Sequence, residues 1–259
     1  MVHTNIKRVS SALVATSLAL VIGLGTTACS GGSSSSATST SGASQTTQAT
    51  ATVEKTASAS GQEEVQSFAN VKVGDTFAFG SYQGKSIGWQ VLAVQDGKAL
   101  IITQEGIDTK PFNTERDGIV WKDCSLRTWL NSDFLNDAFS ADQQKKIATT
   151  TVVNAKNPYW STGGSEETQD KLFCLSITEA EQYFDREGKA MCWPSDYALE
   201  QGAYTDSNGA CCWWLRDSGY DVNQGEAAAN VNTEGFIFDS GAYVDHSTYC
   251  VRPAMWVTM

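Results

Sequence analysis

The chain has 259 residues, and 29 acidic against 18 basic side chains give it a net charge of −11. All of the acidic excess follows residue 60, because the first 60 residues carry three basic side chains and one acidic side chain. Nucleic acid and anionic membrane surfaces are therefore poor partners for the folded part. No stretch reaches the roughly 20 apolar residues that a membrane-spanning helix needs. The composition is typical of an exported globular domain, and it names neither a ligand nor a reaction.

The N-terminus has the pattern of an export signal. Lys7 and Arg8 precede an apolar stretch at residues 12–25, which ends in the sequence Thr26-Thr27-Ala28-Cys29. A basic start, a short apolar core and small residues at the cut are typical of a signal peptide, here residues 1–28. The sequence Thr26-Thr27-Ala28-Cys29 resembles the lipobox of bacterial lipoproteins, although Thr26 stands where leucine is usual. The resemblance implies acylation of Cys29 and a lipid bilayer as partner at the extracellular face of the cell membrane. Plain secretion after the same cut is the alternative.

The segment after Cys29 is dominated by Ser, Thr, Ala and Gly. Such a composition offers nothing to bury and does not offset the entropy of ordering the chain. We therefore expect residues 29–66 to be a lipidated, disordered tether. The domain that they carry is expected at residues 67–259 as a single α+β unit.

Strand patterns lie at both ends of this domain and helix patterns lie between them. Residues 71–81, 87–94 and 98–103 predict an antiparallel meander, with Asp96-Gly97 as a hairpin turn. Further strands are predicted at 149–154, 171–175, 212–216, 227–231, 235–238 and 250–257. Helices are predicted over 126–134, from Ser140 with Gln143 as a capping box, from Ser176 with Glu179 as a second box, and over 196–201. This arrangement indicates an α+β fold with short helices between antiparallel strands.

Spaced motifs along the domain form a recognisable signature. They are Gly74-Asp75-Thr76-Phe77, Ser125-x-Arg127-x-Trp129-Leu130-Asn131, Lys171-Leu172-Phe173, Trp213-Trp214-Leu215-Arg216 and Val251-Arg252-Pro253-Ala254. Together they resemble a family of exported bacterial domains of unknown function, over nearly all of residues 70–257. The C-terminal half is similar, more loosely, to the C-type-lectin-like fold, which includes the sulfatase-modifying (formylglycine-generating) enzymes. That similarity implies a binding domain or, as an alternative, a thiol- or copper-dependent oxidoreductase.

Six cysteines follow the predicted tether, and they are candidates for disulfides: Cys124, Cys174, Cys192, Cys211, Cys212 and Cys250. An even number outside the cytoplasm favours bridges over free thiols. Adjacent Cys211 and Cys212 should point to opposite faces of a strand and take different partners. Pairing of one of them with Cys250 is the first expectation, because their strands should be neighbours.

Other chemistry has weaker support in the sequence. His246 is the one histidine after the signal region, so zinc sites and hydrolytic triads would all depend on it. Phosphate-binding glycine loops are missing from the sequence. Asp221, Asp239 and Asp245 lie among loop asparagines and are candidate Ca²⁺ ligands, although no EF-hand spacing is present. Otherwise we expect no cofactor. Arg216 and Arg252 end apolar strands and are expected to pair with carboxylates.

Aromatic residues in loops supply the candidate ligand contacts: Trp160, Trp193, Tyr204, Trp214, Tyr220 and Tyr243. Exposed aromatic rings beside polar groups suit stacking on sugar rings or burial in a protein partner. Of the adjacent pair Trp213 and Trp214, one should face the core and the other the solvent. The sequence therefore predicts a non-catalytic surface lipoprotein that binds a glycan or a protein. The alternatives are the oxidoreductase and a structural envelope protein without a discrete ligand.

Overall fold

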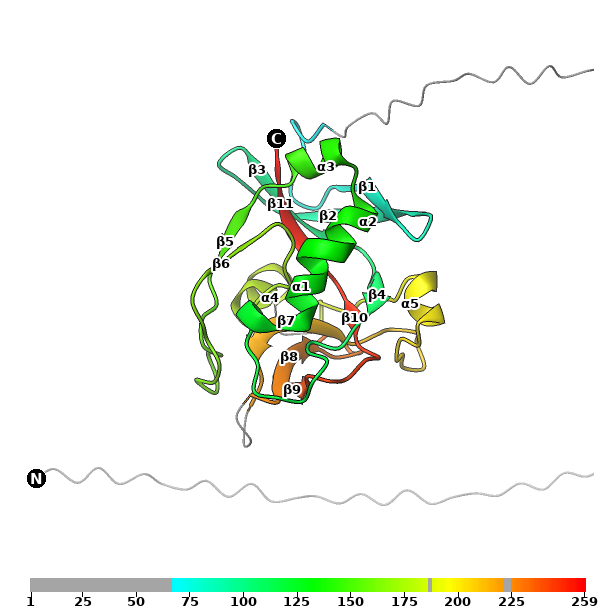
Figure 1. The fold of residues 1–259 in the computed structure, drawn as a ribbon. Coiled ribbons are helices and arrows are strands. Elements are labelled where there is room, and N and C mark those ends of the chain that lie inside the picture. Colours follow the sequence, from blue (N-terminus) through cyan, green and yellow to red (C-terminus); the bar gives the residue numbers. More distant parts are fainter. Residues whose placement is uncertain (1–66, 186–187, 221–224) are drawn as a thin grey trace, which may run out of the picture. The chain divides into compact units, whose positions relative to one another are not determined.

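The computed structural model describes residues 67–185, 188–220 and 225–259, all within one unit that spans Ser60–Met259. The predicted signal peptide, Cys29 and the predicted tether lie outside these described residues. In the part of the chain that is described, no helix is long and apolar enough to cross a membrane. The elements form an α+β fold of mostly antiparallel strands with short helices between them (Figure 1), which confirms the predicted fold class.

The N-terminal meander forms a four-stranded antiparallel sheet with the last strand of the chain. It contains β1 (Thr76–Tyr82), β2 (Lys85–Gln95), β3 (Lys98–Thr103) and β11 (Ala254–Thr258), in that order. Asp96 and Gly97 join β2 to β3, and both have positive φ, at 51° and 70°. That is the backbone of the hairpin turn that an Asp-Gly pair favours.

A five-stranded sheet occupies the other half of the domain. Its order is β4 (Asp108–Thr109), β10 (Cys250–Val251), β7 (Trp213–Ser218), β8 (Ala227–Val231) and β9 (Ile237–Tyr243). The β10–β7 pair is parallel, and the other pairs are antiparallel. A separate two-stranded sheet pairs β5 (Thr150–Val152) with β6 (Thr168–Asp170).

The predicted strand over 250–257 is in fact two strands in different sheets. Cys250 and Val251 pair with β4 and β7, whereas Ala254 onward pairs with β3. The break falls at Arg252-Pro253, where proline has no N–H to donate to a ladder. The predicted strand over 171–175 is also wrong, because in this stretch only Phe173 pairs, in an isolated bridge to Ala254.

The middle of the chain is helical, as predicted. A 3-10 turn η1 (Trp121–Asp123) leads into α1 (Ser125–Trp129), a π-helical turn η2 (Leu130–Phe134) and α2 (Leu135–Ala138). These are followed by α3 (Ala141–Lys146), α4 (Ile177–Phe184) and α5 (Asp196–Glu200). Both predicted capping boxes are present, with Ser140 reciprocating with Gln143 and Ser176 with Glu179.

One continuous hydrophobic core joins the two large sheets and the helices. Four tryptophans are fully buried in it, and each indole N–H has an acceptor. Trp89 donates to the carbonyl of Phe79, Trp121 to Asp170, Trp213 to the carbonyl of Ala190 and Trp214 to that of Lys110. Because each polar group is satisfied, these large side chains contribute apolar burial without leaving an unpaired donor.

Candidate functional site

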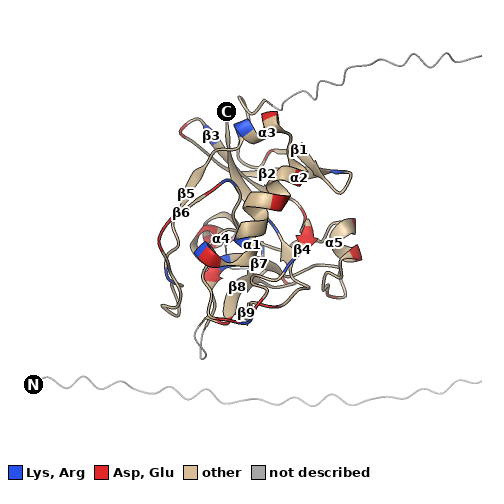
Figure 2. Cartoon of the chain, viewed as in Figure 1, with Lys and Arg blue, Asp and Glu red and all other residues tan. Residues whose placement is uncertain are grey.

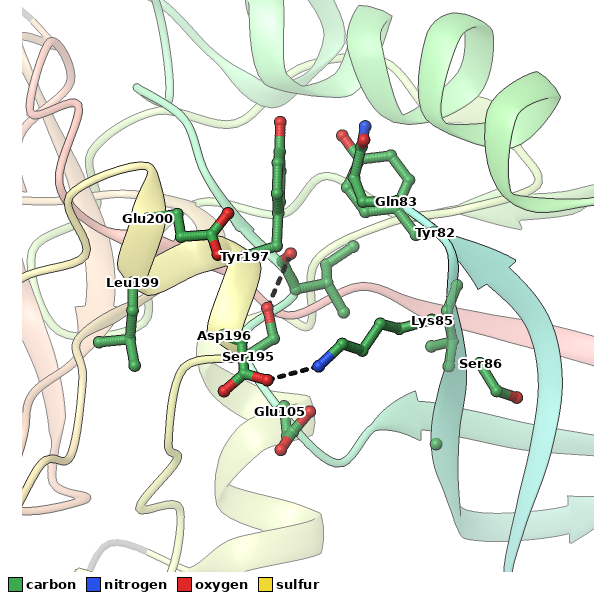
Figure 3. A pocket seen from close by; sticks show the side chains of 13 residues that line it. Tyr82, Gln83, Lys85, Ser86, Glu105, Ser195, Asp196, Tyr197, Leu199 and Glu200 are labelled. Carbon is green, nitrogen blue, oxygen red and sulfur yellow. Dashed lines mark hydrogen bonds and ion pairs between the residues drawn. The ribbon is translucent and has the colours of Figure 1, made fainter.

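A groove of about 670 Å³ lies between the β1–β2 hairpin and α5, which are on the same side of the domain (Figures 1 and 3). Three segments line it: the hairpin at 82–88, the backbone turn at 105–107, and α5 with its cap at 195–200. Its size is within the range of small-molecule sites in proteins. The groove is therefore a concave candidate for ligand binding.

Two tyrosines form an aromatic wall of this groove. The rings of Tyr82 and Tyr197 are 5.6 Å apart and nearly perpendicular, at 89°. Tyr82 Oη donates to Asp108 Oδ2 at 2.8 Å, and burial, followed by this hydrogen bond, raises the pKa of Tyr82. The buried Asp108 also accepts from Lys110 Nζ at 2.8 Å and from the Thr109 N–H at 2.7 Å. Tyr82 is thus held in place from behind by a buried carboxylate.

Polar groups face the aromatic wall across the groove (Figure 3). Lys85 Nζ lies 2.5 Å from Asp196 Oδ2, and both side chains are well exposed. The hydrogen bond between them raises the pKa of Lys85 and lowers that of Asp196. Glu105 and Glu200 are exposed on the same rim, and α5 carries acidic residues at both of its ends (Figure 2). The rim thus offers several hydrogen-bond acceptors and one ammonium donor.

Five of the six predicted aromatic contacts are exposed, at 43–56%: Trp160, Trp193, Tyr204, Tyr220 and Tyr243. The structure brings two of them together, because the rings of Trp160 and Tyr220 are 4.4 Å apart. Trp193 instead donates to the Asn208 carbonyl, and Tyr243 lies 4.0 Å from the Arg116 guanidinium. The predicted residues therefore lie in different local environments, and none of them lines the groove.

Trp214 is fully buried, so its predicted ligand contact is wrong. The expectation that one of Trp213 and Trp214 faces the solvent also fails. Strand β7 is the central strand of its sheet, and all six of its residues are buried. Alternation along a strand separates core from solvent only where one face of the sheet is uncovered.

The two predicted Ca²⁺ ligands that the structure describes, Asp239 and Asp245, each accept hydrogen bonds from another side chain. Asp245 accepts two hydrogen bonds from Arg116 Nε and one from Nη2, and the hydrogen bonding to Arg116 lowers the pKa of Asp245. Asp239 Oδ1 accepts from the Trp160 indole at 2.9 Å. Asp221 lies outside the described residues. In the part of the chain that the structure describes, no group of three or more His, Cys, Asp or Glu residues is placed to hold a metal ion.

All six cysteines of the domain are buried and unbonded in the structure. Cys124 lies near Cys174, and burial raises the pKa of Cys124 to about 12. Cys192, Cys211 and Cys250 form a second group, whereas Cys212 contacts the Tyr249 hydroxyl. Cys211 and Cys212 precede β7 instead of lying in it, and they have different neighbours, although neither forms a disulfide.

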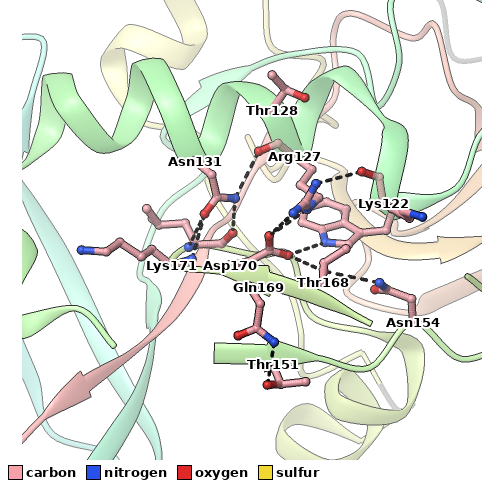
Figure 4. A network of polar contacts seen from close by, with 12 residues as sticks. Lys122, Arg127, Thr128, Asn131, Thr151, Asn154, Thr168, Gln169, Asp170 and Lys171 are labelled. Carbon is pink, nitrogen blue, oxygen red and sulfur yellow. Dashed lines mark hydrogen bonds and ion pairs between the residues drawn. The ribbon is translucent and has the colours of Figure 1, made fainter. Parts of the chain in front are cut away.

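The Ser-x-Arg-x-Trp-Leu-Asn motif acts as a structural clamp (Figure 4). Buried Asp170 accepts from Arg127 Nε at 2.7 Å, from the Trp121 indole at 3.0 Å and from Thr168 Oγ1 at 2.7 Å. Asn131 Nδ2 donates to the Leu172 carbonyl, and Asn131 Oδ1 accepts from the backbone N–H groups of Lys171 and Leu172. These contacts fasten the helical segment to residues 168–172.

The two strand-terminal arginines differ. Arg216 forms a two-pronged ion pair with Glu179, which confirms its predicted partner class. Among the residues that the structure describes, Arg252 has no carboxylate partner, so this prediction is wrong. Its Nε donates to the Thr103 carbonyl at 2.9 Å, and its guanidinium packs against the rings of Phe184 and Trp213, which contact each other. Aromatic faces therefore replace the expected anion.

Residues 96–259 match the model of the family described as Domain of unknown function (DUF6273). The chain belongs to the DUF6273 family. No curated protein and no solved structure matched this DUF6273 chain. The match covers α5 and the turn at 105–107, whereas the hairpin residues of the groove precede it.

The groove was not found from the sequence of this DUF6273 member. Tyr82 and Tyr197 are 115 positions apart in the printed sequence, and no local pattern relates a strand end to a five-residue helix. The available signal was the cap Ser195 ahead of acidic Asp196, which marks the start of α5 beside a loop.

Proposed function

We propose that the protein is a surface-anchored lipoprotein whose domain binds a glycan, without catalysis, in the groove between the β1–β2 hairpin and α5. Acylated Cys29 would hold it at the extracellular face of the cell membrane, with residues 29–66 as tether. The C-type-lectin-like character of the C-terminal half is part of this proposal. Nucleic acid is not proposed as a partner, because the net charge is −11.

The observation that carries the proposal is the pairing of an aromatic wall with a polar rim in one groove. Tyr82 and Tyr197 present ring surface, and Tyr82 is fixed by Asp108. The rim offers amide, ammonium, hydroxyl and carboxylate groups at Gln83, Lys85, Ser86, Glu105, Asp196 and Glu200. Sugars present apolar C–H faces edged by hydroxyls, and this combination of lining groups complements both.

The Ser195 hydroxyl in the groove makes two hydrogen bonds to the backbone, which supports binding over catalysis. Ser195 Oγ accepts from the Ala198 N–H at 3.1 Å as a helix cap and donates to the Ile107 carbonyl at 3.1 Å. A nucleophilic serine needs a general base as its partner. Here the hydroxyl proton goes to a backbone carbonyl instead.

A panel of defined oligosaccharides, including N-acetylated amino-sugar oligomers, tests the binding proposal with the purified full-length protein. We expect Tyr197→Ala to weaken binding of the preferred glycan at least tenfold. Tyr204→Ala removes an equally large exposed ring outside the groove and should leave the affinity unchanged. Loss of affinity with Tyr204→Ala or Trp160→Ala instead, with Tyr197→Ala unaffected, would place binding at the loop aromatics.

The anchor has a separate test. Cells grown with an alkyne analogue of palmitate should label the wild-type protein and not Cys29→Ser. The variant should also leave the membrane fraction. Labelling at another residue, or release of the unlabelled wild-type protein into the medium, would contradict the anchor and favour plain secretion.

The oxidoreductase remains the second candidate because the Cys211 thiol is close to those of both Cys192 and Cys250. Their burial opposes it, since each is at most 1% exposed and no substrate reaches them in this conformation. A structural envelope role would be favoured if the oligosaccharide panel and a screen of surface proteins both gave no ligand.

A further inference from the structure

Three cysteines from separate parts of the chain converge behind the groove wall at 105–107. Cys192 precedes α5, Cys211 precedes β7, and Cys250 begins β10. The Cys211 N–H donates to the Cys192 carbonyl at 2.8 Å, which joins the first two segments. Gly106 packs against Cys211 and Cys250, because a β-carbon at Gly106 would lie 2.9 Å from Cys250 Sγ and 3.4 Å from Cys211 Sγ.

Cys211 is the middle thiol of the three. Its thiol interacts with those of both Cys192 and Cys250, which act on its pKa through side-chain hydrogen bonding. The Cys192 thiol also lies 3.8 Å from the Gln104 carbonyl. Cys212 is directed elsewhere, to the Tyr249 hydroxyl, and does not belong to the group. Either neighbour of Cys211 is thus placed to become its disulfide partner.

Beside this group lies a buried cation that has no anionic partner among the described residues. Arg252 is 4% exposed, and its Nη1 has no hydrogen-bond partner in the described ranges. Burial lowers the pKa of Arg252, and Cys192 and Cys211 act in the opposite direction. A buried, unpaired guanidinium is costly, so an anion next to it would be stabilised. The sulfurs of Cys192 and Cys211 are the groups in a position to supply that anion.

We propose that Cys192, Cys211 and Cys250 form a disulfide-exchange site in which Cys211 is the shared partner. In its resting oxidised form Cys211 is bonded to Cys250, and Cys192 is the free thiolate paired with Arg252. The Cys192 thiolate can take the bond to itself and release Cys250. The oxidant that creates the site is a small-molecule disulfide.

The steps balance in atoms and electrons. Cys211 loses its proton and attacks the small disulfide, which releases one thiolate and leaves a mixed disulfide on Cys211. Cys250 then loses its proton and attacks Cys211 Sγ, which releases the second thiolate. Two electrons have passed to the oxidant. In the exchange step Cys192 attacks Cys211 Sγ, the Cys211–Cys250 bond breaks, and Cys250 leaves as a thiolate that takes a proton. Because all three side chains are buried, we expect the external disulfide to react during folding.

The choice of partner follows from the position of Arg252. In the reduced group, the hydrogen bond with Cys211, followed by burial, raises the pKa of Cys192. A Cys211–Cys250 bond removes the Cys211 thiol. It thereby removes the hydrogen bond that is the larger cause of the raised pKa of Cys192, while the Arg252 guanidinium stays in place. The opposite pairing would leave Cys250 as the free thiol, and Cys250 is not among the groups that act on Arg252.

The test is disulfide mapping of the full chain after oxidative refolding with glutathione disulfide and acid quenching. Wild type should show mainly Cys211–Cys250. Cys250→Ala should show Cys192–Cys211, Cys192→Ala should keep Cys211–Cys250, and Cys211→Ala should show neither. Cys212→Ala is the matched control and should keep the wild-type pattern. A Cys192–Cys250 bond in Cys211→Ala, or a wild-type group without any bond, overturns the proposal.

Arg252 variants test the selection in a chain that keeps all its cysteines. Arg252→Met should lower the ratio of Cys211–Cys250 to Cys192–Cys211 about tenfold, as expected for loss of one charge–thiolate interaction of about one pKa unit. Arg252→Lys should keep most of the ratio. Circular dichroism of each variant shows whether it has folded. An unchanged ratio in folded Arg252→Met would overturn the role of Arg252.

Discussion

Gly106 lies so close to Cys250 that a β-carbon added to the glycine would come within 2.6 Å of the Cys250 β-carbon. On its other side the same turn is the wall of the groove, formed by Glu105 and Ile107. The thiol group and the candidate ligand site are therefore separated by one backbone turn. This turn is fixed by the Gly106 N–H, which donates to the Trp193 carbonyl at 2.9 Å.

Gly106→Ala should destabilise the domain by about 1 to 3 kcal/mol, because the new methyl group meets side chains that are themselves fully packed. Gly88→Ala is the matched control in the same groove. Its β-carbon would meet the end of the Gln104 side chain, which can move away. Urea unfolding of the two variants measures the difference. Equal stability losses would contradict the tight packing of Gly106 on Cys250.

Asp217→Asn should stabilise the protein at neutral pH. Burial raises the pKa of Asp217 from 3.8 to about 6, so the folded state favours its protonated form. The stability from this group is full below about pH 4 and is lost as pH rises through 6. Asparagine has no such loss, and its carbonyl can still accept from the Ile177 N–H, which lies 2.7 Å from Asp217 Oδ2. We expect a gain of about 3 kcal/mol at pH 7.

Urea unfolding at pH 4 and at pH 7 checks this prediction. The advantage of Asp217→Asn over wild type should be small at pH 4 and present at pH 7. An advantage of the same size at both pH values would show that ionisation of Asp217 is not its source. A loss at both would show that the second carboxylate oxygen has a role that asparagine does not replace.

Asp170→Ala should cost about 3 to 5 kcal/mol, because it leaves the Arg127 guanidinium and the Trp121 indole without their acceptor in a mostly buried site. Asp142→Ala removes a carboxylate from an exposed pair with Lys145 and should change stability little. Thermal unfolding of both variants gives the comparison. Similar midpoints for the two would mean that the Asp170 network is not a clamp.

Local signals predicted the parts of the fold that depend on a few neighbouring residues. The Asp96-Gly97 turn and the capping boxes of Ser140 and Ser176 are set by backbone groups within three positions, and all three are present. The break at Pro253 was readable in principle, since proline cannot continue a ladder. It is hard to recognise because residues 250–251 before Arg252-Pro253 and residues 254–257 after it are apolar and typical of strands.

Predictions that depended on what covers a strand were less reliable. The burial of Trp214 and the pairing of Arg252 with rings in place of a carboxylate are set by elements from other parts of the chain. The groove has the same origin, since its walls come from three segments that meet only in the folded domain. A sequence pattern with period two or 3.6 carries no information about such meetings.

Tyr82→Phe separates the two roles of the groove's aromatic wall. The ring and its edge-to-face contact with Tyr197 remain, whereas buried Asp108 loses the hydroxyl donor at 2.8 Å. Asp108 keeps Lys110 and the Thr109 N–H as donors, so we expect a stability loss of about 1 to 2 kcal/mol rather than unfolding. If the ring surface binds the ligand, Tyr82→Phe should keep glycan affinity within about threefold, while Tyr82→Ala should lose it. Equal affinity losses in the two variants would show that the Tyr82 hydroxyl and its link to Asp108, rather than ring surface, set the binding geometry.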